Sequence, residues 1–186
     1  MEVVLIRHTS VDVPKGTCYG HTDVPVRDTF EQEAEVTRRA LEPYLPFDKV
    51  FSSPLTRARK LAAFCGYPDA ETDVRLMEMN MGEWEMQLYD EIQDPHLKVW
   101  YDDYINQPTT GGESFLQQYQ RVAAFLDELK GKPYQRVAIF AHAGVLISAG
   151  LHAGLYSLDD AWSNLPDYGD YIIVETLNFA SPEQGE

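Results

Sequence analysis

The sequence predicts a three-layer α/β/α sandwich around a mainly parallel sheet, with residues 1–186 forming a single domain. Two short apolar runs, within 2–10 and at 136–141, lack alternation, which is typical of strands buried on both faces. Segments with the 3.6-residue apolar period of helices lie between the expected strands, an order typical of parallel sheets covered by helices. The length, with 44% apolar and 24% charged residues, suits one globular core.

The composition limits the partners and the compartment. A net charge of −15 argues against nucleic acid and anionic membranes as partners, although a small anionic substrate can bind where the local charge is positive. Cys18 and Cys65 form no Cys-x-x-Cys motif, which predicts reduced thiols in a cytoplasmic protein. The sequence shows no signal-peptide pattern and no run near the roughly 20 apolar residues of a membrane span.

The first strand is followed by a long loop over 11–26 that is rich in proline, glycine and aspartate. Loops of this length after a strand commonly carry function. A helix is expected from about Phe30 to Tyr44, because Asp28 or Thr29 can cap it and acidic residues lie in its first turn.

The next elements are predicted from short local signals. A strand over 47–52 is followed by Ser53 and Pro54, a pair typical of a helix start with Ser53 as the cap. The apolar residues of this helix share one face, and Gly66 ends it. Residues 71–76 predict a third strand.

The second half of the chain continues the alternation. Residues 78–87 have no period and predict a loop, whereas the regular apolar face of 113–130 predicts an amphipathic helix closed by Gly131. The remaining expected elements are helical patches at 88–93 and 95–105, a turn at 108–112, a strand at 136–141, a helix at about 145–153, a strand at 171–175 and a disordered tail at 181–186.

Two of the apolar strands end in a histidine, His8 and His142. If these strands are neighbours, the imidazoles meet at the carboxyl edge of the sheet, where α/β proteins bind ligands. Arg7 lies beside the first histidine, and Arg57 lies in the first turn of a helix, where a cation opposes the helix dipole unless an anion binds there. The sequence therefore favours a phosphate pocket over the alternative that Arg57 turns to solvent or pairs with an acid.

These residues allow phosphoryl transfer through a phosphohistidine. A neutral His8 can attack phosphorus with one ring nitrogen while the other donates to a backbone carbonyl. The two arginines and His142 would stabilise charge on the phosphoryl oxygens, so neither a metal nor another cofactor is needed. Glu78 is the candidate acid for the leaving oxygen, with Glu83 and Glu85 as competitors in the same loop.

Five motifs in order, LIRHTS, SSPLTRARKLA, RLMEMNMGEWE, GGES and FAHAGV, resemble the histidine phosphatase superfamily over Val3 to about Leu151. The resemblance implies a phosphoglycerate mutase-like fold, with His8 as the phosphorylated histidine and Glu78 as the proton donor. It further implies a phosphate pocket of Arg7, Arg57 and His142, and substrate contacts from Thr9, Tyr19, Gly20 and Ala143.

Some positions depart from the family pattern. Thr9 and Ala143 follow the two histidines where glycine is usual, and a threonine fits such a turn only with negative φ. Met86 also replaces a glycine, Ile147 stands where many relatives have arginine, and Asp12 lies where an asparagine is common. No departure removes a catalytic group, so they bear on the substrate more than on the reaction.

Within the superfamily, the short chain and the loop KGTCYGHTDVPV look most like α-ribazole phosphatases. The resemblance implies a metal-independent phosphomonoesterase acting on a small phosphate ester such as α-ribazole 5′-phosphate, as a monomer or homodimer. The alternatives are a phosphoglycerate mutase, a broad-specificity sugar or nucleotide phosphatase, and a non-catalytic phosphate-binding module.

The remaining aromatic and histidine residues have less specific patterns. His96 and His152 are expected to be structural, and His21 is either a substrate contact or an exposed turn residue. Cys18, His21 and Asp23 match no metal-ligand spacing. Four aromatic residues are expected to pack in the core, with stacking on a substrate base as the alternative: Trp84, Trp100, Tyr101 and Tyr104.

Overall fold

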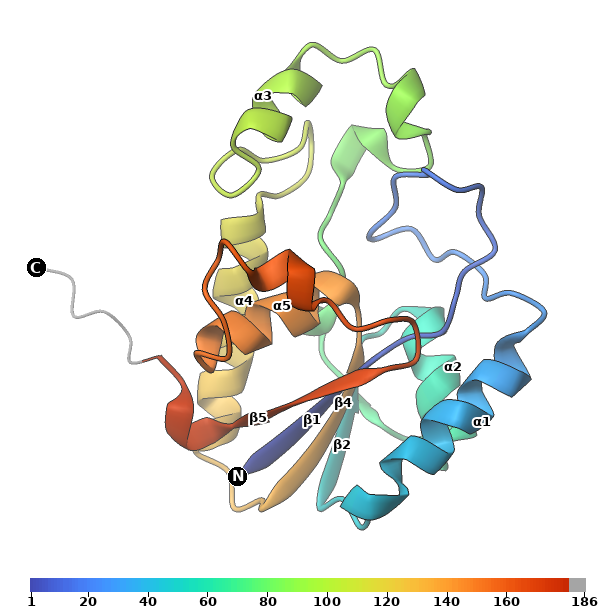
Figure 1. Ribbon diagram of the computed structural model, residues 1–186, viewed down its shortest axis with the longest axis vertical. Helices are drawn as coiled ribbons and strands as arrows, with labels where there is room; N and C mark the ends of the chain where they lie inside the picture. Colours follow the sequence, from blue (N-terminus) through green and yellow to red (C-terminus); the bar gives the residue numbers. More distant parts are fainter. Residues whose placement is uncertain (181–186) are drawn as a thin grey trace, which may run out of the picture.

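The computed structural model describes residues 1–180 and contains a five-stranded sheet in the order β3-β2-β4-β1-β5. All strand pairs are parallel except β1–β5, which is antiparallel. The predicted mainly parallel α/β fold is therefore confirmed (Figure 1). The strands are β1 (Glu2–Arg7), β2 (Lys49–Ser52), β3 (Glu71–Thr72), β4 (Arg136–Ala141) and β5 (Tyr171–Glu175).

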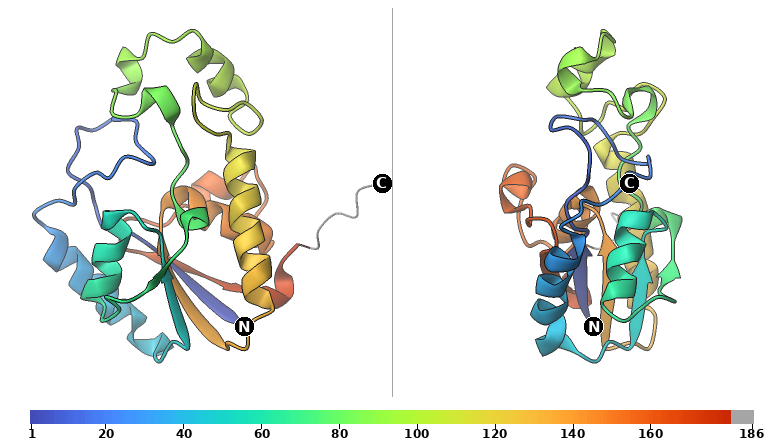
Figure 2. Two further views of the ribbon diagram at one scale, coloured as in Figure 1. Left: turned by 180° about the vertical axis from the view of Figure 1, so that it is seen from behind. Right: turned by 90° about the vertical axis from the view of Figure 1, so that its right-hand side faces the viewer.

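Helices cover both faces of the sheet (Figures 1 and 2). Alternate side chains of β1 and β4 enter two separate apolar clusters, because successive residues of a strand point to opposite faces. One cluster includes side chains of α1 and α2, and the other includes side chains of α4 and α5. The helices are α1 (Phe30–Leu41), α2 (Thr56–Phe64), α3 (His96–Asp102), α4 (Phe115–Lys130) and α5 (Ala143–His152).

A lobe formed by 78–113 and the loop 11–26 stands above the carboxyl edge of the sheet (Figure 1). The two segments are joined by backbone hydrogen bonds, from Cys18 N to Gln87 O (2.8 Å) and from Met86 N to Cys18 O (2.7 Å). Its core is an apolar cluster around the buried Cys18 and Trp84. The lobe thus covers the edge of the sheet at which β1 and β4 end.

The predicted start of the second helix is wrong by two residues. Leu55, not Ser53, is the N-cap of α2. The N–H of Thr56 donates to Asp23 Oδ1 at 2.9 Å, and the Thr56 hydroxyl donates to Asp23 Oδ2 at 2.6 Å. A carboxylate from the distant loop therefore satisfies the helix start that local sequence assigned to a serine.

The predicted third strand is also shorter than expected. It ends at Thr72, because Asp73 Oδ1 accepts a hydrogen bond from Arg75 N (2.8 Å) and starts a 3₁₀ turn over Val74–Leu76. This local side-chain bond competes with strand pairing.

Other boundaries shift by a few residues. The first helix turns 3₁₀ after Leu41, and residues 88–93 contain only a 3₁₀ turn at Tyr89–Glu91. Gly131 caps α4 with a negative φ of −81°, so no left-handed residue is needed there. The predictions for β4 and β5 are confirmed to the residue. The predicted disordered tail lies outside the described residues.

Candidate active site

The parallel ladder between β1 and β4 places the two strand-end histidines side by side. Arg7 pairs with Ala141, so His8 and His142 are the next residue on each strand. Their ring centroids are 5.3 Å apart, and both side chains are buried. With Arg7 and Arg57 they form what we call the anion cup.

His8 presents a free lone pair to the cup. Its Nδ1 lies 2.7 Å from Thr9 O. Because a carbonyl only accepts, Nδ1 carries the proton and Nε2 is unprotonated. Burial, together with the nearby Arg57 and Arg7 guanidiniums, lowers the pKa of His8 from 6.5 to about 3, so the ring is neutral at physiological pH.

His142 also carries its proton on Nδ1, but its Nε2 is already occupied by a partner. Its Nε2 lies 2.8 Å from Ser53 Oγ, which accepts from Leu55 N (3.2 Å) and can donate its own hydrogen to the ring. Nδ1 then carries the proton and has no hydrogen-bond partner within residues 1–180. Burial and Arg57 hold the pKa of His142 well below 6.5. One ring therefore offers a lone pair and the other an N–H.

The two arginines bring positive charge without an acidic partner. Arg57 is fully buried and donates to Thr22 O (2.8 Å) and Gly20 O (2.6 Å). Arg7 donates to Pro166 O (2.7 Å) and lies 4.0 Å over the Tyr168 ring. In the described part of the chain neither forms an ion pair, and the Nε of each is buried without a partner.

This arrangement disagrees with the alternative in which Arg57 reaches solvent or pairs with an acid. A buried guanidinium without a counter-ion is costly unless an anion binds. The cup therefore has the charge and the donors of a phosphate site.

Glu78 lines a cavity of about 390 Å³, as does Ala143, the residue that follows His142. Of the three candidate acids, only Glu78 lines this cavity. Glu85 instead accepts hydrogen bonds from the backbone of Gly20 (2.9 Å) and His21 (2.7 Å) and so supports the loop 11–26. The cavity is also lined by Tyr19, Met79, Met81, Tyr89, Trp100, Tyr101, Tyr104, Phe115, Gln118, Ala143, Gly144 and Trp162.

The four expected substrate contacts divide into two pairs. Tyr19 and Ala143 line the cavity, whereas Thr9 and Gly20 do not. Thr9 is fully buried with negative φ, as the turn requires. A Cβ on Gly20 would lie only 1.7 Å from Met79 O, so glycine there allows the loop to pack against the lobe. Thr9 and Gly20 instead support the cup through their backbone carbonyls, which bond His8 and Arg57.

Sequence reasoning missed Tyr168, the role of Ser53, and Gln118. Tyr168 lies 5.7 Å from the His8 ring, centroid to centroid, yet it belongs to a loop without any periodic signal. Ser53 bonds His142 across 89 positions. Trp84 is buried packing as predicted, but Trp100, Tyr101 and Tyr104 line the cavity.

His152 and His96 are held by contacts with the protein outside the cup. His152 bonds Asp127 (2.8 Å), and His96 bonds Pro108 O (2.8 Å), as structural residues do. Over residues 1–180 no three metal-ligating side chains cluster. No helix in the same part of the chain has the length and apolar character needed to cross a membrane.

Comparison with known proteins relates this geometry to a family. The profile described as "Histidine phosphatase superfamily (branch 1)" matches residues 3–178, a range that includes the whole cup. The adenosylcobalamin/alpha-ribazole phosphatase of Salmonella typhimurium is 30% identical over 154 residues, covering 78% of this chain and 76% of that protein. Phosphoserine phosphatase 1 of Hydrogenobacter thermophilus is 23% identical over 184 residues, covering 94% and 86%.

Solved structures extend the similarity to three dimensions. The crystal structure of the alpha-ribazole phosphatase from Shigella flexneri has a TM-score of 0.82 and 28% sequence identity, covering 94% of this chain and 90% of that one. The match therefore includes the sheet, its helices and the lobe.

Proposed function

Because this chain belongs to the histidine phosphatase superfamily (branch 1) and is a phosphatase, we propose that it hydrolyses a small phosphate monoester through a phosphohistidine at His8. One observation carries the proposal. The neutral His8, with an unprotonated Nε2, lies in a cup whose two arginines have no acidic partner among the described residues. A phosphate dianion supplies the missing charge.

The proposed reaction has two steps. In the first, His8 Nε2 attacks phosphorus, the bond to the ester oxygen breaks, and Glu78 gives that oxygen its proton. In the second, water attacks phosphorus, the bond from phosphorus to His8 Nε2 breaks, Glu78 takes a proton from the water, and inorganic phosphate leaves. His142 Nδ1–H and the two guanidiniums stabilise the equatorial oxygens in both steps.

The cavity supports a leaving alcohol that carries an aromatic ring system. Six aromatic rings and Tyr19 surround it, and flat apolar walls favour a stacked ring. We propose α-ribazole 5′-phosphate, an aromatic riboside ester, as the substrate. Relatives named as alpha-ribazole phosphatases support this choice. A small polar ester such as phosphoserine would leave most of the cavity unfilled.

The nucleophile is tested with His8→Ala in a chelating buffer. We expect loss of at least about 10³-fold in kcat, because covalent catalysis is removed, and loss of the acid-labile phosphoenzyme trapped from the wild type. His96→Gln, outside the cup, is the matched control and should keep both. Full activity of His8→Ala would refute the assignment. Anion binding without turnover in the wild type would instead indicate a phosphate-binding module.

The substrate is tested by comparing kcat/KM for α-ribazole 5′-phosphate, phosphoserine, sugar phosphates and nucleotides. We expect the aromatic riboside ester to lead by about 10- to 100-fold, the value of one or two well-packed ring contacts. Isomerisation of phosphoglycerate without phosphate release would identify a mutase. Equal values across the set would identify a broad-specificity phosphatase.

The compartment and assembly belong to the same proposal. We propose a cytoplasmic enzyme that is a monomer or homodimer. Cys18 and Cys65 are free thiols, and they support a reducing compartment. Sedimentation at several protein concentrations decides between monomer and dimer.

A further inference from the structure

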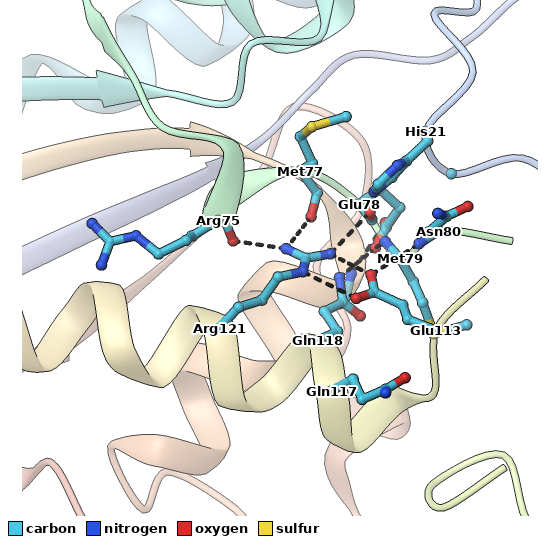
Figure 3. A network of polar contacts seen from close by, with 12 residues as sticks. His21, Arg75, Met77, Glu78, Met79, Asn80, Glu113, Gln117, Gln118 and Arg121 are labelled. Atoms are coloured by element: carbon cyan, nitrogen blue, oxygen red, sulfur yellow. Dashed lines mark hydrogen bonds and ion pairs between the residues drawn. The ribbon is translucent and has the colours of Figure 1, made fainter. Parts of the chain in front are cut away.

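The two oxygens of the Glu78 carboxyl group have unequal surroundings (Figure 3). Oε1 accepts hydrogen bonds from Met79 N and from Gln118 Nε2, both at 2.9 Å. Within residues 1–180, Oε2 accepts one hydrogen bond, from Gly144 N at 3.2 Å. A carboxyl oxygen has two lone pairs, so the two donors saturate Oε1. A proton on this carboxyl therefore belongs on Oε2.

We propose, on the basis of the function above, that Gln118 is a positioning residue that reserves Oε2 of Glu78 for the proton given to the leaving oxygen. Without the amide, Oε1 would have a free lone pair, and the proton could reside on either oxygen. Only one of the two would then face the ester bond. General acid catalysis depends on this geometry.

Tight packing fixes the amide and the carboxyl group together. Gln118 is 1% exposed. A Cβ on Gly144 would lie 2.4 Å from Glu78 Oε1 and 2.5 Å from Gln118 Oε1. The first turn of α5 therefore approaches this pair so closely that a side chain at position 144 would displace Glu78 or Gln118.

Arg121, one turn along α4, holds the backbone of the same acid. Its Nη1 donates to Arg75 O and Met77 O, both at 2.7 Å, and its Nη2 donates to Glu78 O at 3.0 Å. Glu113 holds the guanidinium through two hydrogen bonds of 2.6 and 3.2 Å. Figure 3 shows both attachments arising from one helix. α4 thus fixes the main chain of Glu78 through Arg121 and its carboxyl group through Gln118.

Leaving-group dependence separates this role from a structural one. An alkyl phosphate needs a proton on its leaving oxygen, whereas 2,4-dinitrophenyl phosphate does not. We expect Gln118→Leu to lower kcat about 10-fold on the alkyl ester and less than about 2-fold on the dinitrophenyl ester, with KM nearly unchanged. Gln120→Leu, an exposed site on the same helix, is the matched control and should leave both unchanged. Gln118→Met carries the test if the leucine variant does not fold.

Two results would overturn the inference. Equal effects on both esters, including no effect, would show that Gln118 does not act through the acid. A loss confined to KM would show that it only contacts substrate. Glu78→Gln distinguishes this failure from failure of the proposed function. If Glu78→Gln is selective for the alkyl ester and the Gln118 variants are not, the inference alone fails. If Glu78→Gln is not selective, the proton donor itself is wrong.

Discussion

At the scale of the residue, the cup is built from two histidines that both carry their proton on Nδ1 but differ in which ring nitrogen has a partner. The carbonyl of Thr9 fixes the proton of His8 on Nδ1, and Ser53 fixes that of His142 on the same atom by occupying its Nε2. The ring orientations differ by 60°. The nucleophile and the N–H donor therefore come from the same residue type, and their neighbours alone assign the roles.

The low pKa of His8 predicts a specific pH dependence of stability. The unfolded chain binds a proton at His8 below about pH 6.5, whereas the folded chain does so only near pH 3. The contribution of His8 to stability is therefore fully present above pH 6.5 and decreases as the pH falls toward 3. Between pH 7.5 and 5 this amounts to about 2 kcal/mol of unfolding free energy.

Urea unfolding of the wild type and His8→Gln at both pH values measures this difference. The wild type should lose about 2 kcal/mol more than the variant. Parallel losses would show that His8 is not held neutral by the fold.

Sequence reasoning located the groups at strand ends but not their supports. His8, His142 and Arg7 could be predicted, because an apolar run shows where a strand ends. Tyr168 and Gln118 could not be predicted, because Tyr168 contacts His8 across 160 positions of the chain and Gln118 contacts Glu78 across 40. No local pattern encodes a contact of that range.

At the scale of the element, α2 is positioned by a loop rather than by its own cap. Asp23 holds Thr56 with both carboxylate oxygens, and the next residue is Arg57. The same loop supplies the two carbonyls that Arg57 bonds. Loop and helix are therefore one unit of the cup, although they are far apart in sequence.

Removing Asp23 should weaken this unit. We expect Asp23→Ala to lower the unfolding free energy by about 1 kcal/mol, as for a lost helix cap, and to weaken binding of inorganic phosphate, because Arg57 loses its alignment. Calorimetry and phosphate titration measure the two effects. Asp23→Asn, which keeps an oxygen acceptor, should retain more of both, and equal losses in the two variants would argue against the cap.

The predicted element boundaries are wrong where a side-chain hydrogen bond, and not the backbone pattern, starts or ends the element. Ser53 has the signature of an N-cap, but His142 occupies its hydroxyl. Asp73 ends β3 by bonding two residues ahead. Both are polar residues whose competing partners become visible only after the chain has folded.

At the scale of the whole molecule, the sheet and the lobe share the cavity. Ala143 and Gly144 come from the start of α5 at the sheet edge, and Glu78, Trp100 and Tyr101 come from the lobe. We therefore propose that residues 1–186 unfold as one domain, since Arg121 and Glu113 connect α4 to the lobe.

Two probes of one unfolding transition test this proposal. All three tryptophans, Trp84, Trp100 and Trp162, lie in the lobe or along the cavity, so fluorescence reports that region. Far-UV circular dichroism reports the helices and the sheet. Their urea midpoints should coincide, and an earlier fluorescence transition would show that the lobe unfolds separately.

The register of β1 on β4 has a consequence for how new specificities could arise. The reactive atoms are set by adjacent rungs of one hydrogen-bonded ladder, while the walls that meet the alcohol belong to segments inserted between strands. Grafting new wall residues into those segments, with Glu78 and the carbonyls that hold Arg57 kept, would exchange one alcohol for another and leave both histidines in place. A single-residue deletion within β1 would have the reverse outcome, because it would turn the nucleophile toward the wrong side of the sheet.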